Sequence, residues 1–420
     1  MDPRALRAVV ASTVGTAIEW YDFFLYGVAA ALVFPKVFFP GSDPYSATLA
    51  SFGTYFVGFV ARPVGAALFG HWGDRLGRKA SLVATLLLMG LATIAIGLVP
   101  GYDRIGIWGA VLLTVCRVLQ GIGVGGEWAG SVLMAAEWGP KHQRGFLASW
   151  PQFGAPAGLL LANGAVMAMS ALSGDAFLTW GWRIPFVASI VLVGIGLWIR
   201  RGVGETPTFD RLKADNRIER APVVEVIRRH WREIVLTGLL RTGQQTPFYV
   251  FTAFVLSYGT QRLGLSRGAL LGDVLLAAAV SMVTIPLFGH LSDRVGRERM
   301  LAFGALLMVF WPFAYFGLLD TASPWLVLLA IVLAEPIHDL QYAPQAAIIA
   351  DAFPAELRYS GASLGYQLAS LTAGGPAPLV ALWLLERTGA SWSIAAYLSG
   401  TGVVTLLALW GLRRLGTRAA

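Results

Sequence analysis

Twelve long apolar stretches, separated by short charged segments, restrict this chain to very few folds. Of its 420 residues, 56% are hydrophobic and only 13% are charged. A soluble domain has about 25% charged residues, and about 20 apolar residues in a row can cross a bilayer. Within a bilayer only helices and closed barrels satisfy the backbone, and continuous apolar runs favour helices. The sequence therefore predicts an all-α membrane protein with twelve transmembrane helices.

The predicted helices fall into two sets of six on either side of a polar segment. We expect a first half at 1–200, a partly helical cytoplasmic linker at 201–230 and a second half at 231–420. The predicted spans are 8–34, 45–71, 80–99, 105–136, 145–170, 180–200, 231–258, 268–289, 300–319, 323–350, 358–385 and 391–412.

Two short motifs occur once in each half. GDRLGRK at 73–79 is echoed by SDRVGRER at 292–299, and EWGPKHQRG at 137–145 by DAFPAELRYSG at 351–361. Each pair is separated by about half the chain and is predicted to lie in loops of the same order. The pattern indicates a parallel repeat, with two halves of the same topology.

Lysine and arginine positions predict the orientation of the chain. If the N-terminus is cytoplasmic, 23 of the 32 basic residues lie inside, six lie outside and three (Arg62, Arg117 and Arg241) lie within the membrane. Cytoplasmic loops carry the excess of positive charge, so both termini are predicted to be cytoplasmic. This distribution explains the pI near 9.8 without a nucleic-acid partner.

Longer motifs resemble a known family over nearly the whole chain. The 73–79 loop is similar to the signature of the major facilitator superfamily, and five motifs resemble its metabolite:proton symporters. They are EWYDFFLYG (19–27), RPVGAALFGHWGDRLGRK (62–79), RVLQGIGVGGEWAG (117–130), WGWRIPF (180–186) and YSGASLGYQLAS (359–370). TAFVLSYGTQRLGLS (252–266) and IHDLQYAPQ (337–345) look most like the shikimate-carrier branch.

The resemblance implies two six-helix halves around a central cavity and a monomeric, proton-coupled symporter working by alternating access. A shikimate-like hydroxy-carboxylate is the first expected substrate, followed by a di- or tricarboxylate such as 2-oxoglutarate or citrate. Alternatives are uptake of a zwitterion such as proline or betaine, and a non-transporting sensor, which would need an added soluble domain. The resemblance also implies that the protein is located in the bacterial inner membrane, in contact with the lipid bilayer. No enzyme activity, cofactor or metal is expected.

Charged residues at membrane depth are the candidates for proton coupling, because burying each costs about 2.5–3.5 kcal/mol. Asp22 is the first candidate and Glu19 the second, and both share a helical face with Tyr26. We expect Arg117 to face one of these acids. Glu335, His338 and Asp339 form a second acidic face, and a histidine between acids could relay protons.

Arginines and amides on the same faces are the candidates for substrate binding, since an arginine fork matches a carboxylate. A fixed ion pair that only assembles the bundle is the alternative. The candidates are Arg117, Arg241, Tyr26, Gln120, Gln152, Gln244, Gln245, Tyr249, Gln341, Tyr366 and Gln367.

The repeated motifs resemble a cytoplasmic gate, in which breakable charge pairs hold one state. The alternative is that their basic residues only enforce topology. We expect the first copy to be the stronger gate, because Ser292 and Glu298 alter the second. The gate candidates are Asp74, Arg75, Arg78, Glu137, Arg144, Asp293, Arg294, Arg297, Asp351 and Arg358.

Overall fold

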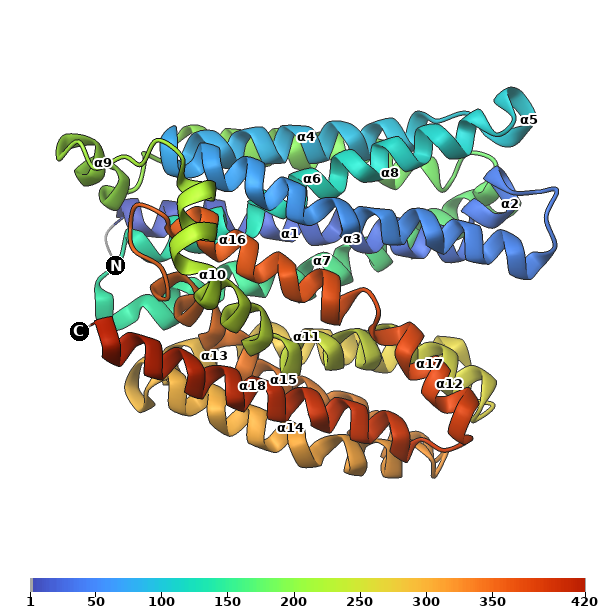
Figure 1. The fold of residues 1–420 in the computed structure, drawn as a ribbon. Helices are drawn as coiled ribbons and strands as arrows, with labels where there is room; N and C mark the ends of the chain where they lie inside the picture. The colour runs from blue at the N-terminus through green and yellow to red at the C-terminus, as the bar shows by residue number, and fades with distance from the viewer. Residues whose placement is uncertain (1–2, 420) are drawn as a thin grey trace.

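A computed structural model describes residues 3–419, and every regular element in that range is a helix (Figure 1). We call residues 1–200 the first half and residues 231–420 the second half. The long helices of the first half are α1 (Pro3–Leu32), α3 (Pro44–Arg75), α4 (Arg78–Leu98), α6 (Trp108–Glu137), α7 (Arg144–Ser173) and α8 (Arg183–Arg201). Short helices α2 (Phe34–Phe38), α5 (Tyr102–Ile105), η1 (Lys141–Gln143) and η2 (Gly174–Leu178) connect them.

The second half contains four continuous long helices and two interrupted ones. The continuous helices are α13 (Arg267–Val295), α14 (Arg297–Leu319), α15 (Pro324–Asp351) and α18 (Trp392–Ala419). One interrupted span consists of α10 (Pro222–Leu240), α11 (Thr242–Tyr249), η3 (Val250–Phe254) and α12 (Val255–Gln261). The other consists of α16 (Arg358–Ala369), η4 (Ser370–Gly374) and α17 (Ala377–Thr388).

Each interruption has a local cause. Both interrupted spans contain a π-helical turn, η3 and η4, a feature common at functional sites. Pro247 removes a backbone donor just before η3, and Gly375 and Pro376 separate η4 from α17. The linker contains α9 (Pro207–Ala214), and α10 is kinked at His230, where φ is −122°.

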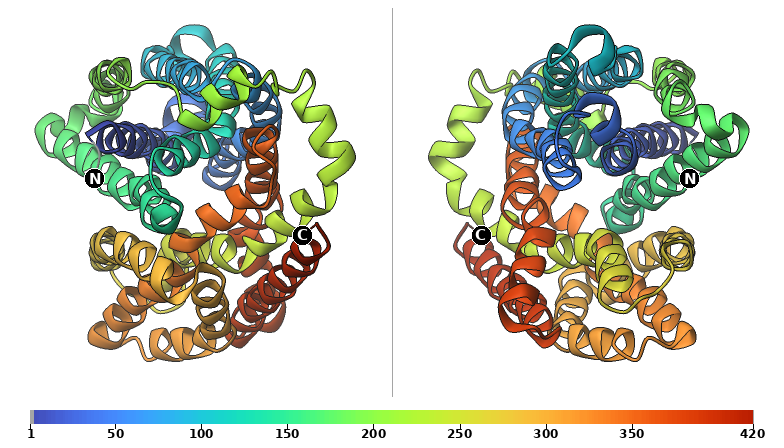
Figure 2. Two further views of the ribbon diagram at one scale, coloured as in Figure 1. Left: turned by 90° about the vertical axis from the view of Figure 1, so that its left-hand side faces the viewer. Right: turned by 90° about the vertical axis from the view of Figure 1, so that its right-hand side faces the viewer.

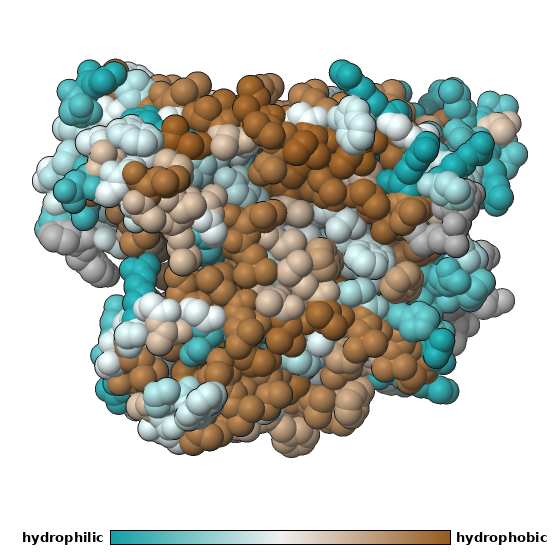
Figure 3. Space-filling view, turned by 180° about the vertical axis from the view of Figure 1, so that it is seen from behind, coloured by the Kyte–Doolittle hydropathy of each residue, from teal (hydrophilic) through white to brown (hydrophobic). Residues whose placement is uncertain are grey.

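Ten helices of the described chain are long and apolar enough to cross a membrane. The other two predicted spans, α1 and the α10–α12 segment, carry charged and amide side chains at mid-length, which lower their hydropathy. Large apolar side chains on the outside are exposed, as Trp325 is at 80% and Trp198 at 75%. They form a hydrophobic belt between two polar ends, as expected for a surface in lipid (Figure 3).

The two halves lie against each other along their length. In Figure 1 the helices from α1 to α8 occupy the upper part and most of those from α11 to α18 the lower part, while α16 reaches up beside α3, as the end-on views in Figure 2 also show. Helix α7 packs on α13 and α15, and α3 packs on α16. Both termini and α9 lie at one end of the bundle. The exact domain limits stay a prediction.

The repeated motif was expected to be a loop, but most of it is helix end. Asp74 lies in the last turn of α3, and only Leu76 and Gly77 form the turn before α4. Gly77 has φ of 111° and its counterpart Gly296 has φ of 105°. Only glycine adopts this region readily, so the shared glycine is what allows each tight reversal between helices.

Candidate functional site

Arg117 lies buried at the centre of the first half. Its guanidinium stands 4.3 Å from the ring centre of Tyr26 and 4.7 Å from that of Tyr55. It donates to Gln120 Oε1 at 3.1 Å and to the Tyr55 carbonyl at 3.5 Å. Gln120 in turn donates to Thr93 at 2.7 Å. Rings and neutral oxygens therefore surround this cation.

The two acids of α1 do not pair with Arg117. Asp22 accepts from Ser189 at 3.2 Å through Oδ1, and its Oδ2 has no hydrogen-bond partner among the described residues. Glu19 Oε2 also has none there. Neither carboxylate lies within ion-pair distance of Arg117, so the expected pairing is wrong for this conformation. The physical reason is that the Tyr26 and Tyr55 rings occupy the faces of the guanidinium.

Arg241 holds the corresponding place in the second half, at the junction of α10 and α11. It donates to the Tyr366 carbonyl at 3.0 Å and to Ser370 Oγ at 3.1 Å. Its guanidinium lies 3.1 Å from the centre of the Tyr366 ring, and its Nε has no partner in the described chain. Among the described residues, Glu335 and Asp339 of α15 lie beside His338, and neither forms an ion pair with Arg241.

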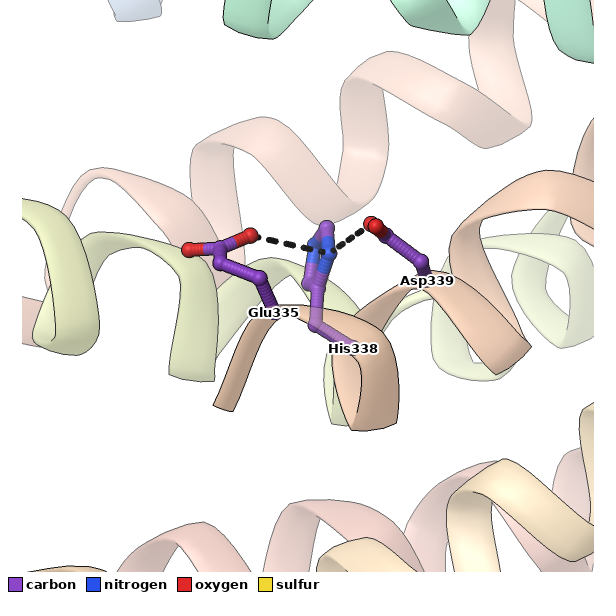
Figure 4. A group of neighbouring side chains, drawn as sticks. All are labelled: Glu335, His338 and Asp339. Atoms are coloured by element: carbon purple, nitrogen blue, oxygen red, sulfur yellow. Dashed lines mark hydrogen bonds and ion pairs between the residues drawn. The ribbon is translucent and has the colours of Figure 1, made fainter. Parts of the chain in front are cut away.

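Glu335, His338 and Asp339 of α15 form a buried cluster (Figure 4). His338 Nδ1 lies 2.9 Å from Asp339 and 3.8 Å from Glu335. Ser281 of α13 lies 3.0 Å from Glu335 and 2.7 Å from Asp339. The three ligand atoms lie within 4.8 Å of one another, which would suit a metal ion, although we predicted a proton site here.

The cluster extends into α11 through side-chain amides. Gln244 Nε2 lies 2.6 Å from His338 Nε2, and Gln345 Nε2 donates to Gln244 Oε1 at 3.1 Å. An amide N–H can donate only to an unprotonated ring nitrogen, so this geometry fits a neutral His338 whose Nδ1 proton faces Asp339. A small cavity of about 20 Å³ lies beside the histidine, lined partly by Ser281.

The remaining predicted binding residues are all buried between the helices. Gln152 accepts from Trp128 at 2.7 Å and donates to the Tyr342 carbonyl of the second half at 3.1 Å. Several buried polar atoms have no hydrogen-bond partner among the described residues. They include the hydroxyls of Tyr249, Tyr342 and Tyr366 and the Oε1 atoms of Gln341, Gln345 and Gln367. Two members of the set remain. The Tyr26 hydroxyl forms a hydrogen bond of 2.7 Å with Thr54, and the Gln245 side chain lies against Gly374.

Sequence reasoning assigned no site role to three residues that the structure makes prominent. Trp128 stacks on Tyr366 of the other half with ring centres 3.6 Å apart. Arg200 forms a buried ion pair with Glu127. Arg62 is buried beside Phe23 and Phe59. The signal for Arg62 was available, because it is one of three arginines at membrane depth.

Asp74 of the first motif caps a helix of the opposite half. Its two carboxylate oxygens accept from the backbone N–H groups of Tyr359 at 3.2 Å and Ser360 at 2.9 Å, at the start of α16. A helix N-terminus favours a negative charge, so the contact ties α3 to α16. All three residues are buried, which excludes competing water.

Arg78 connects this cap to neighbouring charges. It lies 3.4 Å from Asp74 and 3.9 Å from Glu137, and Glu137 lies 3.6 Å from Arg358. Glu205 of the linker accepts from the backbone N–H of Arg78 at 3.0 Å and so caps α4. Burial raises the pKa of the Glu205 carboxyl above its ordinary value, against the opposing effect of these hydrogen bonds.

Asp293 of the second motif makes the equivalent cap in the reverse direction. It accepts from the N–H groups of Gly145 at 2.9 Å and Phe146 at 2.8 Å, at the start of α7. Arg297 lies 2.8 Å from Asp293. The second copy is more open to solvent, because the Arg297 side chain is 19% exposed whereas that of Arg78 is fully buried.

Asp351 completes the second network with contacts to Arg144 at 2.9 Å and Arg297 at 3.2 Å. Arg75 and Arg294 do not join either network. Both are exposed and form no ion pair with a described residue. Each follows its aspartate directly, and the helical turn of about 100° points it away from the opposite half. No ion pair with a described residue supports their predicted place in the gate, which stays a prediction.

A helical bundle with a lipid-facing exterior, two similar halves and buried charges between them defines a multi-pass membrane transporter. The chain matches the model of the Major Facilitator Superfamily over residues 12–374, and it belongs to that superfamily. Its fold and relatives are those of transporters, not of enzymes.

Proteins of Escherichia coli are among its relatives. The shikimate transporter is 43% identical, with 94% of this chain and 91% of that protein covered. The inner membrane metabolite transport protein YhjE is 41% identical, covering 96% and 93%, and the proline/betaine transporter is 34% identical, covering 97% and 83%. The solved proton:xylose symporter XylE has a TM-score of 0.80 at 19% identity, covering 97% and 95%, and so shares the fold.

Proposed function

We propose that this protein is a proton-coupled symporter that imports a small organic acid by alternating access. The observation that carries this proposal is the buried chain of hydrogen bonds from Glu335 through Ser281, Asp339 and His338 to Gln244. It places titratable groups at membrane depth within reach of one another, as a proton path requires.

A count of the protons in this chain of hydrogen bonds supports the proposal that it can take up one more proton. Ser281 has a single hydroxyl proton but contacts both Glu335 and Asp339. If that proton points to Asp339, the contact with Glu335 becomes a hydrogen bond only when Glu335 is protonated. The chain can thus hold one additional proton between α13 and α15. Asp22 and Glu19 are the competing carriers in the first half.

A hydroxylated monocarboxylate such as shikimate is the proposed substrate. The 43% identity to a shikimate transporter favours it, and Arg62, Arg117 and Arg241 supply three buried positive charges. A zwitterion is the second candidate, because a proline/betaine transporter is 34% identical. The protein is proposed to work as a monomer in a bacterial inner membrane with both termini cytoplasmic. This orientation puts both aspartate caps on the cytoplasmic side, where they would hold the halves closed.

Uptake into proteoliposomes tests the proposal. Labelled shikimate, 2-oxoglutarate, citrate and proline are supplied with and without an imposed inward proton gradient. We expect shikimate to accumulate only with the gradient. Uptake that is indifferent to the gradient would reject proton coupling, and accumulation of proline alone would favour the zwitterion.

A further inference from the structure

Arg62 of α3 is a buried cation that forms no ion pair with a described residue. Its residue is only 4% exposed, and no carboxylate of a described residue lies within ion-pair distance. The guanidinium stands 4.4 Å from the centre of the Phe59 ring and 4.8 Å from that of Phe23. Rings stabilise a cation but accept none of its five N–H groups in the way an oxygen does.

The other two membrane-depth arginines use their donors within their own halves. Arg117 bonds Gln120 and the Tyr55 carbonyl, and Arg241 bonds the Tyr366 carbonyl and Ser370. Arg62 makes no comparable hydrogen bond with the described part of its own half. It is therefore the arginine with the most unused donors, and a buried charged donor without an acceptor is costly.

Tyr249 of the second half brings a second unused donor to the same place. Its hydroxyl lies beside the Arg62 guanidinium and makes no hydrogen bond of normal geometry with a described residue. The Tyr249 ring packs 5.8 Å from Phe59 and 6.4 Å from Phe23. A guanidinium cannot accept the hydroxyl proton, so Tyr249 and Arg62 both need an acceptor, a role that a carboxylate between them would fill.

The surroundings place this pair at the contact between the halves. Arg62 lies over the Phe23 and Phe59 rings of the first half, and the same two rings contact the Tyr249 ring of α11 in the second half. An anion bound here would touch both halves and balance positive charge that the described acids leave unpaired. Carboxylates bind guanidinium forks with two short parallel hydrogen bonds.

We propose that Arg62 and Tyr249 hold the carboxylate of the transported substrate from opposite halves. The inference rests on the proposed function in one respect, that the cargo is an organic acid. It does not depend on which acid is carried, since shikimate, 2-oxoglutarate, citrate and proline all have a carboxylate. A carboxylate bound at this point contacts both halves. Its binding is therefore coupled to the movement of one half relative to the other.

Equilibrium binding to the purified full-length protein in lipid nanodiscs tests this assignment. The probe is whichever labelled acid among shikimate, 2-oxoglutarate, citrate and proline binds the wild type most tightly. We expect Arg62→Gln to weaken binding by about 30-fold or more and Tyr249→Phe by about fivefold, as loss of charged and neutral hydrogen bonds predicts. Arg62→Lys keeps the charge and should fall between Arg62→Gln and wild type.

The methyl ester of the same acid separates recognition from folding. The ester has no carboxylate, so it should compete with the labelled acid more weakly than the free acid does. The affinity for the ester should be the same in the wild type and in Arg62→Gln. Tyr315→Phe is the matched control, because Tyr315 is equally buried with an unpartnered hydroxyl but packs on Phe251 and Phe316. We expect that control to bind as the wild type does.

Three results would overturn the inference. They are unchanged acid binding by Arg62→Gln, equal weakening of acid and ester, and no binding of any of the four acids to the wild type. Arg62-dependent binding without gradient-driven uptake would instead reject the symport proposal and leave this site standing. Gradient-driven uptake by Arg62→Gln with an unchanged KM would reject this binding site and leave the symport proposal standing.

Discussion

The buried charges at the end of the bundle that contains the repeated motifs have charged partners, whereas two buried arginines at mid-membrane have none among the described residues. At the end that contains the repeated motifs, Arg78, Asp74 and Glu137 are joined in one network, and Arg200 pairs with Glu127. At mid-membrane, Arg62 and Arg117 have no carboxylate partner among the described residues. Removing one partner of a buried pair leaves an uncompensated charge and is strongly destabilising, and a buried charge without a partner is costly unless a ligand neutralises it.

The comparison separates the parts that hold one conformation from the parts that respond to cargo. Breaking an end network should change which conformation is populated. Changing a mid-membrane charge should change binding or coupling and leave the closed end intact. The predictions below follow this division from the largest effect to the smallest.

Arg117→Lys is expected to have the largest effect, a fall in uptake of about 100-fold. A lysine cannot reproduce the planar fork that reaches both Gln120 and the Tyr55 carbonyl, and it would leave Gln120 without its donor. Initial uptake rates in proteoliposomes measure this. Backbone exchange at Tyr359 and Ser360 serves as the control and should stay slow. A simultaneous loss of protection there would erase the distinction between the two levels.

His338→Gln and Asp22→Asn form a matched pair that locates the proton carrier. If the α15 chain carries the proton, His338→Gln should reduce gradient-driven accumulation by about tenfold or more while substrate exchange continues. Asp22→Asn should then accumulate substrate nearly as the wild type does. The opposite pattern would place the carrier in α1, as the sequence first suggested. Accumulation and exchange are measured on the same vesicles.

Asp74→Asn and Asp293→Asn compare the two caps. Loss of the charged acceptor should speed amide exchange at Tyr359 and Ser360 by about tenfold in the first variant. Asp293→Asn should speed exchange at Gly145 and Phe146 by only about threefold, because its network is partly solvated. Hydrogen exchange followed by mass spectrometry resolves both segments. Equal effects would contradict our expectation that the first copy is the stronger gate.

Glu205→Gln should produce the smallest change, in the pH dependence of thermal stability. Burial raises the folded pKa of Glu205 above the ordinary value of a glutamate, so the folded protein binds this proton more tightly than the unfolded chain does. Its contribution to stability is therefore present below that pH and is lost as pH rises through the folded pKa. The melting temperature of the wild type should fall relative to the variant over that window. Parallel curves would show that Glu205 does not titrate differently on folding.

The helices were predictable because membrane spans depend on local composition and length. The predicted start of the seventh span at 231 falls one residue after the kink at His230. The repeated glycine was visible as Gly77 and Gly296. Its role in a positive-φ reversal was not, since the motif looked like a longer loop.

The candidate residues could be predicted from the sequence because burying a charge in a membrane costs free energy. The residues that contact them could not be predicted. Asp22, Arg117 and His338 were singled out because a charge at membrane depth needs a reason. The sequence suggested that Asp22 or Glu19 neutralises Arg117, and the structure surrounds Arg117 with Tyr26 and Tyr55 instead. Helical spacing fixes which residues share a face, but it says nothing of what the facing helix presents.

The sequence by itself determined the membrane environment, the two-fold repeat and which side chains are charged at depth, because each of these follows from local composition and spacing. Only the tertiary structure decided which of those charges are neutralised. Ion pairs such as Arg200 with Glu127 join helices far apart in the chain, and a separation of a few ångströms decides between a pair and an unpaired charge. That is why Arg62, which the sequence placed at membrane depth without a role, becomes a candidate for substrate binding in the fold.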